Sequence, residues 1–466
     1  MILPKSIFRS YDIRGVYPLD FNEVYAAQIG RALGTFLQNK NLKNIVLGRD
    51  DRASSPAISE RFIEGLLSTG CNVTDIGITL TPIIHFLTHS NKYDAGVIVT
   101  ASHNPKEFNG IRIDYAKGVP FFGDDIQALY ELTQNQQYKT GHGSLTKKDE
   151  SSVYINFLKK MFPLKRSLKV LVDCGSGSTS IIAPRIFNEL NQQVIPVYCN
   201  YDSNFPHGVP DPENKLFMGD LSKKVLEQHA DIGFVFDTDG DRFGVVDEKG
   251  TIYDNDKLLL LFAENILKKQ RGTVLCDIKS SSLVIELIKT FGGFPKMIRT
   301  GHPFFMEEMK KGALVGAEYS GHTYFADKYF GFDDGVYAAC RVLEILNESS
   351  ESLSSLMKHF PKRYHTGEIK IACPDDKKFT VVEKIKKIAE KATDILSFSE
   401  IDGIRMQSTP TGWFLIRASN TSPYLSIRIE GGTEKELKFL QNQVVELLKA
   451  FKLSGADLKK EEIYFS

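Results

Sequence analysis

Short runs of Val and Ile alternate along the chain with longer segments in which apolar positions recur every three or four residues. Period-two apolar runs favour strands and period-3.6 runs favour helices, so the alternation predicts repeated β-α-β units. The predicted strands are residues 44–48, 72–77, 95–100, 169–173, 233–236, 272–277 and 314–318, and the predicted helices are 55–68, 179–190, 256–268 and 281–290. Three similar α/β regions follow from this pattern.

The order of elements changes after about residue 365. A strand at 368–372 and a helix at 379–391 precede strands near Ile404, Trp413 and Tyr424, and a helix at 434–449 follows. This order predicts a smaller α+β domain.

Polar stretches rich in Gly and Ser predict the joints between regions. They lie at residues 140–152, 247–253 and 361–367. We therefore expect three α/β domains and a C-terminal α+β domain around a central cleft, with boundaries 1–147, 148–250, 251–364 and 365–466.

Composition fits an ordinary globular protein, and length fits several domains. The 466 residues are 42% hydrophobic and 25% charged, and 58 Lys and Arg balance 58 Asp and Glu. A net charge near zero gives no overall attraction to nucleic acid or an anionic membrane, so an acidic ligand must be met by local cations. We expect small-molecule ligands and a monomer or weak homodimer.

No apolar stretch is long enough for a signal peptide or a membrane span, which predicts a cytoplasmic protein. The 6 cysteines lie far apart without a C-x-x-C pair. We expect most of them to be reduced and buried.

Three carboxylates alternate directly after an apolar strand, in the segment Asp237-Thr238-Asp239-Gly240-Asp241-Arg242. At about 4 Å and an effective dielectric constant near 20, each like-charged pair costs about 4 kcal/mol. The crowding therefore predicts a bound cation, and oxygen ligands alone suit Mg²⁺ or Mn²⁺.

Two other patterns compete for this segment. An EF-hand would place ligands at Asp237, Asp239, Asp241 and Glu248, but Arg242 stands where the loop needs glycine, and strands flank it. A phosphatase of the haloacid-dehalogenase type would use Asp237 as its nucleophile. That motif normally opens a chain, and here it lies in the middle.

Ser102 follows the predicted strand at 95–100, in the segment Thr100-Ala101-Ser102-His103-Asn104-Pro105. Open α/β sheets bind ligands at the carboxyl ends of their strands. The segment lacks the G-x-S-x-G elbow of a hydrolase, and a lone serine in a loop is usually structural.

Together the two segments resemble the phosphoserine loop and the metal loop of the α-D-phosphohexomutases. Gly316-Ala317-Glu318-Tyr319-Ser320-Gly321-His322 is similar to their sugar-binding loop, and Arg417-Ala418-Ser419-Asn420-Thr421-Ser422-Pro423 to their phosphate-binding loop. Shorter echoes include residues 8–15, 48–52, 81–82, 173–175 and 331–335. The resemblance covers the whole chain, one motif per domain, and is strongest to the bacterial phosphomannomutase/phosphoglucomutase branch.

The resemblance implies reversible phosphoryl transfer between hexose 1-phosphate and hexose 6-phosphate, through a phosphoserine enzyme and a hexose 1,6-bisphosphate. One Mg²⁺ per chain would be bound by Ser102, Asp237, Asp239 and Asp241. It further implies catalytic roles for Ser102, Arg242, His322 and Arg14, and substrate binding by Tyr11, Glu318, Ser320, Arg417, Ser419, Asn420, Thr421 and Ser422. His103 and His302 compete with His322 as the general acid or base, and Arg112 is a further candidate cation near Ser102.

The chain departs from the family at Met306. The segment 300–306 resembles a family string that ends in a lysine expected to contact substrate. Either Lys310 or Lys311 replaces that lysine, or the substrate is bound differently. The dehalogenase-type phosphatase and a non-catalytic sugar-phosphate-binding protein remain the alternatives in function.

Overall fold

The computed structural model describes residues 3–90, 92–390, 395–419, 423–451 and 464–465. The chain divides into two compact units. The first contains Met1–Asn255, Phe305–Gly316 and Ser320–Leu356, and the second contains Asp256–Phe304, Ala317–Tyr319 and Met357–Ser466.

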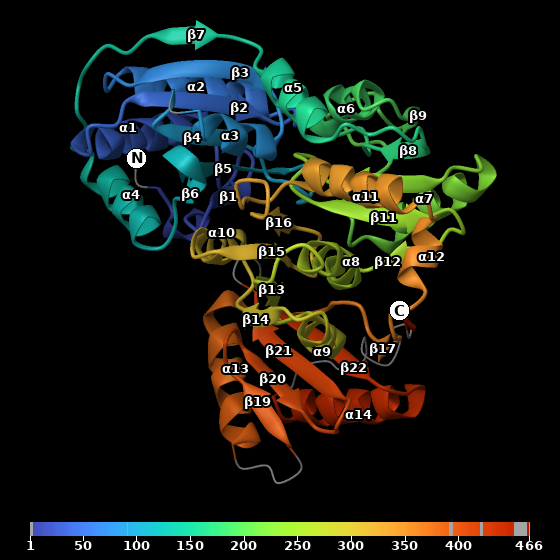
Figure 1. Ribbon diagram of the computed structural model, residues 1–466. Helices are drawn as coiled ribbons and strands as arrows, with labels where there is room; N and C mark the ends of the chain where they lie inside the picture. The colour runs from blue at the N-terminus through green and yellow to red at the C-terminus, as the bar shows by residue number, and fades with distance from the viewer. Residues whose placement is uncertain (1–2, 91, 391–394, 420–422, 452–463, 466) are drawn as a thin grey trace. The chain divides into compact units, whose positions relative to one another are not determined.

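The first sheet has the strand order β1-β5-β4-β2-β3-β7, and β6 pairs with β5. Its strands are β1 (Ile13–Val16), β2 (Asn44–Arg49), β3 (Asn72–Ile78), β4 (Ala95–Val99), β5 (Phe108–Tyr115), β6 (Val119–Pro120) and β7 (Leu145–Lys147). Its helices are α1 (Glu23–Asn39), α2 (Ser55–Leu67), α3 (Thr81–Thr88) and α4 (Asp124–Asn135), with short 3-10 turns η1 (Lys5–Ile7) and η2 (Ala116–Gly118). β2, β3 and β4 run parallel and side by side (Figure 1), whereas β5 is antiparallel to β4.

Helices cover both faces of this sheet, as the continuous apolar runs of β2 and β4 require. Ile45 and Leu47 of β2 belong to the core cluster that includes α1 and α2. Gly96 of β4 faces α3, where an added Cβ would lie 2.6 Å from Ile84. The close approach sets α3 directly against the strands that lead to Ser102.

The second sheet, also in the first unit, has the order β12-β11-β10-β8-β9. Its elements are α5 (Ser151–Met161), β8 (Lys169–Asp173), η3 (Ser178–Ile181), α6 (Ala183–Glu189), β9 (Gln193–Val197), α7 (Lys215–Glu227), β10 (Ile232–Phe236), β11 (Phe243–Asp247) and β12 (Ile252–Tyr253). β10 is buried throughout and pairs with β11 as an antiparallel hairpin, so the segment 237–242 is the connection of that hairpin.

The predicted helix at 179–190 is wrong in its first part. A 3-10 turn, η3, precedes a shorter helix, α6, and Pro184 lies in the first turn of α6. Proline has no backbone N–H and fits only the first turn of a helix, so the α-helix begins at that point.

The third α/β region is divided between the units. α10 (His302–Lys310), β15 (Ala313–Ala317), β16 (Thr323–Phe325), α11 (Gly335–Ser349) and α12 (Leu353–Met357) lie wholly or largely in the first unit, apart from a few end residues. α8 (Asn255–Leu267), β13 (Thr273–Asp277), α9 (Ser282–Thr290) and β14 (Phe294–Ile298) belong to the second, except Asn255. β13 and β14 are parallel.

The C-terminal sheet has the order β19-β20-β21-β22-β17-β23, and β18 pairs with β22. The elements are β17 (Tyr364–His365), β18 (Ile369–Ala372), α13 (Asp375–Ala389), β19 (Ser397–Ser399), β20 (Ile404–Gln407), β21 (Trp413–Ala418), β22 (Tyr424–Gly431), α14 (Glu434–Ala450) and β23 (Tyr464–Phe465). α13 and α14 share one apolar core with the inner strands.

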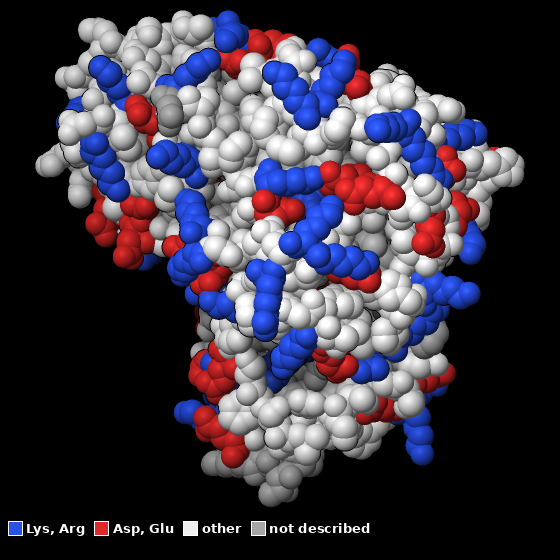
Figure 2. All heavy atoms as spheres, in the orientation of Figure 1, with Lys and Arg blue, Asp and Glu red and all other residues white. Residues whose placement is uncertain are grey.

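The predicted fold class of three α/β domains and a C-terminal α+β domain is confirmed. The exact domain boundaries and the central cleft stay predictions. Among the described residues, no helix combines the length and apolarity needed to cross a bilayer. All 6 cysteines are free, and Cys199 alone is only partly buried. On the face in Figure 2, Lys and Arg lie interspersed with Asp and Glu.

Candidate active site

The loop between β4 and β5 carries Ser102 in a left-handed backbone conformation, with φ of +48°. The backbone N–H of Ser102 donates to Thr100 Oγ1 at 2.9 Å, and the N–H of Asn104 donates to the carbonyl of Ala101 at 3.0 Å. A non-glycine residue with positive φ is uncommon, and such residues gather at functional sites. Ser102 is thus held in a tight turn, 7% exposed.

The three aspartates of the hairpin between β10 and β11 converge as the sequence predicts. One oxygen from each of Asp237, Asp239 and Asp241 lies within 4.8 Å of the others, and all three are buried. Gly240 turns the hairpin with φ of +74°. The hydroxyl of Ser102 donates to Asp237 Oδ2 at 2.7 Å, so the serine and the carboxylates form one site.

The carboxylates carry more negative charge than their surroundings neutralise. Burial, then the charges of Asp241 and Asp239, raise the pKa of Asp237 well above its usual range. Burial and the charge of Asp241 raise the pKa of Asp239 to about 6. For Asp241, burial acts to raise the pKa, but His322 and Arg112 outweigh it and the pKa is lowered. A raised carboxyl pKa is the expected result of crowding acids without a cation.

These residues fit a small divalent cation. Asp239 Oδ1 and Asp241 Oδ1 are buried without a hydrogen-bond partner among the described residues. Buried carboxylate oxygens require a partner, and a set of oxygen ligands suits Mg²⁺. The observation agrees with the predicted metal loop.

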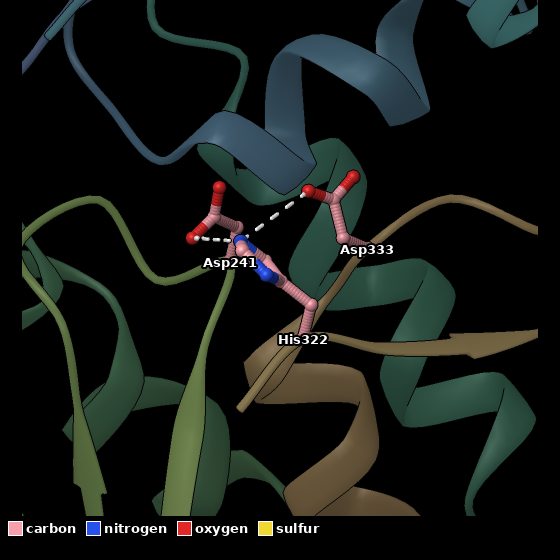
Figure 3. A group of neighbouring side chains, drawn as sticks. All are labelled: Asp241, His322 and Asp333. Carbon is pink, nitrogen blue, oxygen red and sulfur yellow. Dashed lines mark ion pairs between the residues drawn. The ribbon is translucent and has the colours of Figure 1, made fainter. Parts of the chain in front are cut away.

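A second acidic group adjoins the first and is already neutralised by a side chain. Asp241 and Asp333 lie 3.5 and 4.0 Å from His322 Nε2 (Figure 3). Arg112 of β5 donates to both oxygens of Asp333, at 2.9 Å each, and to Asp241 Oδ2 at 3.1 Å. The guanidinium therefore supplies the positive charge that a metal would bring.

Two other segments fix the metal loop from outside. Thr81, at the start of α3, donates through its hydroxyl to Asp239 Oδ2 at 2.6 Å, and its N–H donates to the carbonyl of Asp239 at 3.0 Å. Gly335 donates to the carbonyl of Gly240 at 3.1 Å, and a Cβ on Gly335 would lie 2.5 Å from the carbonyl oxygen of Arg242. The segments 81–82 and 331–335, which resemble the family in sequence, therefore contact the aspartate loop and hold it in place.

Arg242 and His322 lie against each other. Arg242 Nε is 3.3 Å from His322 Nε2, and Ser320 Oγ is 3.3 Å from His322 Nδ1. Burial would lower the pKa of Arg242, but the negative charges of Glu213 and Asp211 raise it overall, so its charge is retained. A permanent cation and a titratable ring thus flank the aspartates.

Arg14 approaches the serine loop from β1. Its Nη1 donates to Asn104 Oδ1 at 2.8 Å, and its Nη2 lies 2.8 Å from Asp12 Oδ2. Tyr11 is partly buried and lies two residues before that strand. His103 Nδ1 lies 3.1 Å from Ser102 Oγ, so the ring of His103 is in direct contact with the hydroxyl.

The other predicted site residues belong to the second unit. Glu318 accepts the N–H of Gly301 at 2.6 Å, and Arg417 is held by Asp402, with Nε 3.0 Å from Oδ2. Ser419 is buried. Asn420, Thr421 and Ser422 lie outside the described residues.

Sequence reasoning missed Lys279 of the second unit. This lysine is 3% exposed, follows β13, and lies 3.3 Å from Glu368. Its position at the carboxyl end of a buried strand was the available signal. A buried lysine here is a candidate cation for an anionic substrate.

The residues near Met306 separate the two lysines considered as replacements. Met306 is buried with its sulfur 3.9 Å from Arg112 Nη2. Lys310 is exposed but donates to the carbonyl of Gly118 at 3.2 Å, whereas Lys311 lies 3.0 Å from Glu308 at the surface. Lys310 is therefore the one directed toward the first α/β region.

Four consecutive profiles of the phosphoglucomutase/phosphomannomutase family match: alpha/beta/alpha domain I at residues 5–140, domain II at 152–250, domain III at 254–364 and the C-terminal domain at 368–447. The chain therefore belongs to the phosphoglucomutase/phosphomannomutase family, within the α-D-phosphohexomutases, as predicted.

Particular relatives place it among bacterial members. A phosphomannomutase/phosphoglucomutase of Pseudomonas syringae is 41% identical over 94% of this chain and 94% of its own. A phosphoglucomutase of Neisseria meningitidis is 36% identical over 95% of this chain and 96% of its own. A crystal structure of a Burkholderia thailandensis protein of this family matches with a TM-score of 0.90 and 34% identity, covering 97% of this chain and 98% of that one.

Proposed function

We propose that this chain interconverts hexose 1-phosphate and hexose 6-phosphate, of mannose or glucose or both, by passing the phosphoryl group through Ser102. Family membership and relatives named phosphomannomutase/phosphoglucomutase make the chain a hexose phosphate mutase. The observation that supports Ser102 as carrier is its 2.7 Å hydrogen bond to the buried aspartate cluster.

The proposed reaction consists of two phosphoryl transfers. In the first, the bond between phosphorus and Ser102 Oγ breaks while a bond forms between phosphorus and a hydroxyl oxygen of the hexose phosphate; a base takes the hydroxyl proton, and Ser102 Oγ gains a proton to become a free hydroxyl. The resulting hexose 1,6-bisphosphate reverses its orientation. In the second, the bond between the other phosphorus and its sugar oxygen breaks while a bond forms between that phosphorus and Ser102 Oγ; the Ser102 hydroxyl loses its proton, and the sugar oxygen gains one and leaves with the product.

Asp237, Asp239 and Asp241 would hold Mg²⁺ beside Ser102. When bound, the ion supplies positive charge that offsets the roughly two negative charges of phosphoserine. Arg242 adds a second cation at the same place, because its pKa is raised and it adjoins His322. Phosphoryl transfer depends mainly on such positioning and charge.

His322 is the residue that we propose to hold or release the hydroxyl proton. Its Nε2 lies 3.3 Å from Arg242 Nε, a contact in which Nε2 must accept, and 3.5 Å from Asp241 Oδ1, a contact that favours a protonated Nε2. The two contacts call for opposite protonation states. A ring between such neighbours can gain or lose a proton with little rearrangement.

Binding of the sugar and of the phosphate that does not react falls to the remaining predicted residues. Arginine binds phosphate through two parallel hydrogen bonds, which suits Arg417 with the hydroxyl of Ser419. Glu318 and Ser320 would hydrogen-bond ring hydroxyls. Arg14, Tyr11, Asn420, Thr421 and Ser422 complete the proposed set.

Replacement of Ser102 by Ala tests the route. Phosphorus NMR of protein with glucose 1-phosphate or mannose 1-phosphate, Mg²⁺ and hexose 1,6-bisphosphate should show the 6-phosphate with wild type and with Ser355→Ala, an exposed serine. Ser102→Ala should form none while melting normally. A Ser102→Ala protein that still isomerises the substrate overturns the proposal.

The two alternatives predict other spectra, and the family assignment does not favour either. A phosphatase acting through Asp237 would release free phosphate with or without Ser102. A non-catalytic sugar-phosphate-binding protein would leave the phosphorus spectrum of the substrate unchanged, with wild type and with Ser102→Ala alike.

The other predictions rest on the sequence alone: a cytoplasmic protein that acts as a monomer or weak homodimer, on small hexose phosphates and not on nucleic acid or membrane. Light scattering after size-exclusion chromatography tests the oligomeric state.

A further inference from the structure

One buried arginine, Arg52, holds the backbone of the loop that carries Ser102. Its Nη1 donates to the carbonyls of Pro105 at 2.7 Å and Phe108 at 3.1 Å. Its Nη2 donates to the carbonyls of Ser102 and Asn104, each at 2.6 Å. Four carbonyls of residues 102–108 therefore converge on one guanidinium.

The remaining donor is also satisfied. Arg52 Nε donates to Asp50 Oδ2 at 3.0 Å, and Asp50 Oδ1 accepts the backbone N–H of Arg52 at 3.1 Å. Ser55, at the start of α2, donates to the same Asp50 oxygen. A guanidinium has five N–H groups in a rigid plane, and the structure provides an acceptor for each.

The guanidinium is closed to solvent. Arg52 is 1% exposed, and the ring of Phe205 lies over it with its centroid 5.7 Å from Cζ. The bond to the carbonyl of Ser102 is buried as well, so losing the guanidinium leaves that carbonyl without a donor. Because Arg52 is enclosed, it is also kept away from any ligand of the site.

We propose that Arg52 is a positioning residue for phosphoryl transfer, one that sets the Ser102 hydroxyl opposite Asp237 by fixing the loop backbone at the serine and in the residues that follow it. The inference rests on the proposed role of Ser102. Ser102, whose backbone has a left-handed φ of +48°, is itself one of the four residues whose carbonyls the guanidinium holds.

Lysine keeps the charge of Arg52 but has three donors and no planar fork. With Arg52→Lys we expect kcat to fall about 10- to 100-fold, since a shift of about 1 Å in a reacting group can cost about 10²-fold. The KM for the hexose 1-phosphate should stay within about threefold, because Arg52 contacts no ligand group. Phosphorylation of Ser102 by hexose 1,6-bisphosphate, measured in a single turnover, should slow by the same factor as kcat.

Arg341→Lys is the matched control. Arg341 is equally buried, at 1% exposed, and is paired with Asp327 at 2.8 Å and Glu344 at 3.2 Å on α11. It should lose thermal stability to a similar extent and keep kcat within about twofold. An Arg52→Lys protein whose kcat falls no further than that of Arg341→Lys, or whose loss lies in KM alone, overturns the proposal.

If Arg52→Lys does not fold, Asp50→Asn provides the same test with a smaller change, and we expect a kcat several-fold below wild type with KM retained. An unchanged kcat in a folded Asp50→Asn protein would then count against the positioning role of Arg52. Ser102→Ala separates the two proposals. Activity in Ser102→Ala ends the proposed function, whereas an inactive Ser102→Ala beside a fully active Arg52→Lys ends the positioning role alone.

Discussion

The hydroxyl of Ser102 donates a 2.7 Å hydrogen bond to Asp237, a residue 135 positions further along the chain. The two residues lie at the carboxyl ends of β4 and β10, strands of different sheets within one compact unit. Their contact joins the proposed phosphoryl carrier to the proposed metal ligands. Phosphorylation would add an anion to this acidic place, so the charge of a cation is needed most in that state.

Mg²⁺ should stabilise the folded protein. A ligand that binds only the folded state at 100 times its Kd adds about 2.7 kcal/mol. We expect the melting temperature to rise with Mg²⁺ and to fall again with EDTA, and we expect Asp239→Asn to abolish most of this response. Differential scanning fluorimetry measures it, with Asp124→Asn, an exposed carboxylate, as control. An Asp239→Asn protein that responds like wild type would exclude Asp239 as a ligand.

Removing Arg112 should be strongly destabilising. Asp333 is fully buried and receives two 2.9 Å hydrogen bonds from Arg112. Loss of one partner leaves a buried charge uncompensated, at about 3–5 kcal/mol. Arg112→Met should therefore lower the free energy of unfolding by that amount, measured by unfolding in urea.

Asp333→Asn supplies the control in a double-mutant cycle. The pair Arg112→Met with Asp333→Asn should be more stable than Arg112→Met alone, because the uncompensated carboxylate is gone. Equal stability of Arg112→Met and of the double variant would show that the unpaired carboxylate of Asp333 is not what destabilises Arg112→Met.

The sequence located the aspartate cluster of the first unit because the spacing of its residues is local. Asp237, Asp239 and Asp241 alternate within one hairpin, and Ser102 follows a strand that is apolar throughout. Elements with a single hydrophobic period were also predicted to within a few residues. The strand predicted at 169–173, for example, is β8. Local spacing suffices where a single turn brings the ligands together.

What the sequence could not predict depends on distant contacts. Arg112 and Asp333 are 221 positions apart, and Arg52 reaches carbonyls about 50 positions away, which leave no mark in the side-chain pattern. The helix expected at 179–190 failed for a local reason, since the apolar period continued through Pro184. Side chains that bind backbone groups are the class that pattern reasoning misses.

Stability should depend on pH through Asp173. Burial raises its pKa to about 7 from a usual value of 3.8, and its Oδ2 has no hydrogen-bond partner among the described residues. Between these values the folded state binds a proton that the unfolded state has lost, so this group's contribution is full below about pH 4 and is lost as pH rises to about 7.

Asp173→Asn mimics the protonated side chain and can still accept the N–H of Gly175, which lies 2.9 Å from Asp173 Oδ1. The stability of the variant relative to wild type should therefore increase from pH 5 to pH 7 and stay constant above, by an amount on the order of a few kcal/mol. Urea unfolding at pH 5, 6, 7 and 8 measures the difference. A difference that does not change with pH would show that Asp173 is ionised throughout.

Met306 should tolerate an apolar replacement and reject the family lysine. Its side chain is 1% exposed and its sulfur lies 3.9 Å from Arg112 Nη2. Met306→Leu conserves volume and should cost less than about 1.5 kcal/mol.

Met306→Lys places an ammonium group in a buried site beside a guanidinium, so burial and like charge should lower the pKa of the new lysine. The folded state then binds fewer protons than the unfolded state, and the stability of Met306→Lys should recover as pH rises from 7 to 10. Thermal melting across that range measures the recovery, with Met306→Leu as the control that should show none. If Met306→Lys instead matches Met306→Leu at pH 7 and is the more active enzyme, the place still accepts the family lysine, and Lys310 is not its replacement.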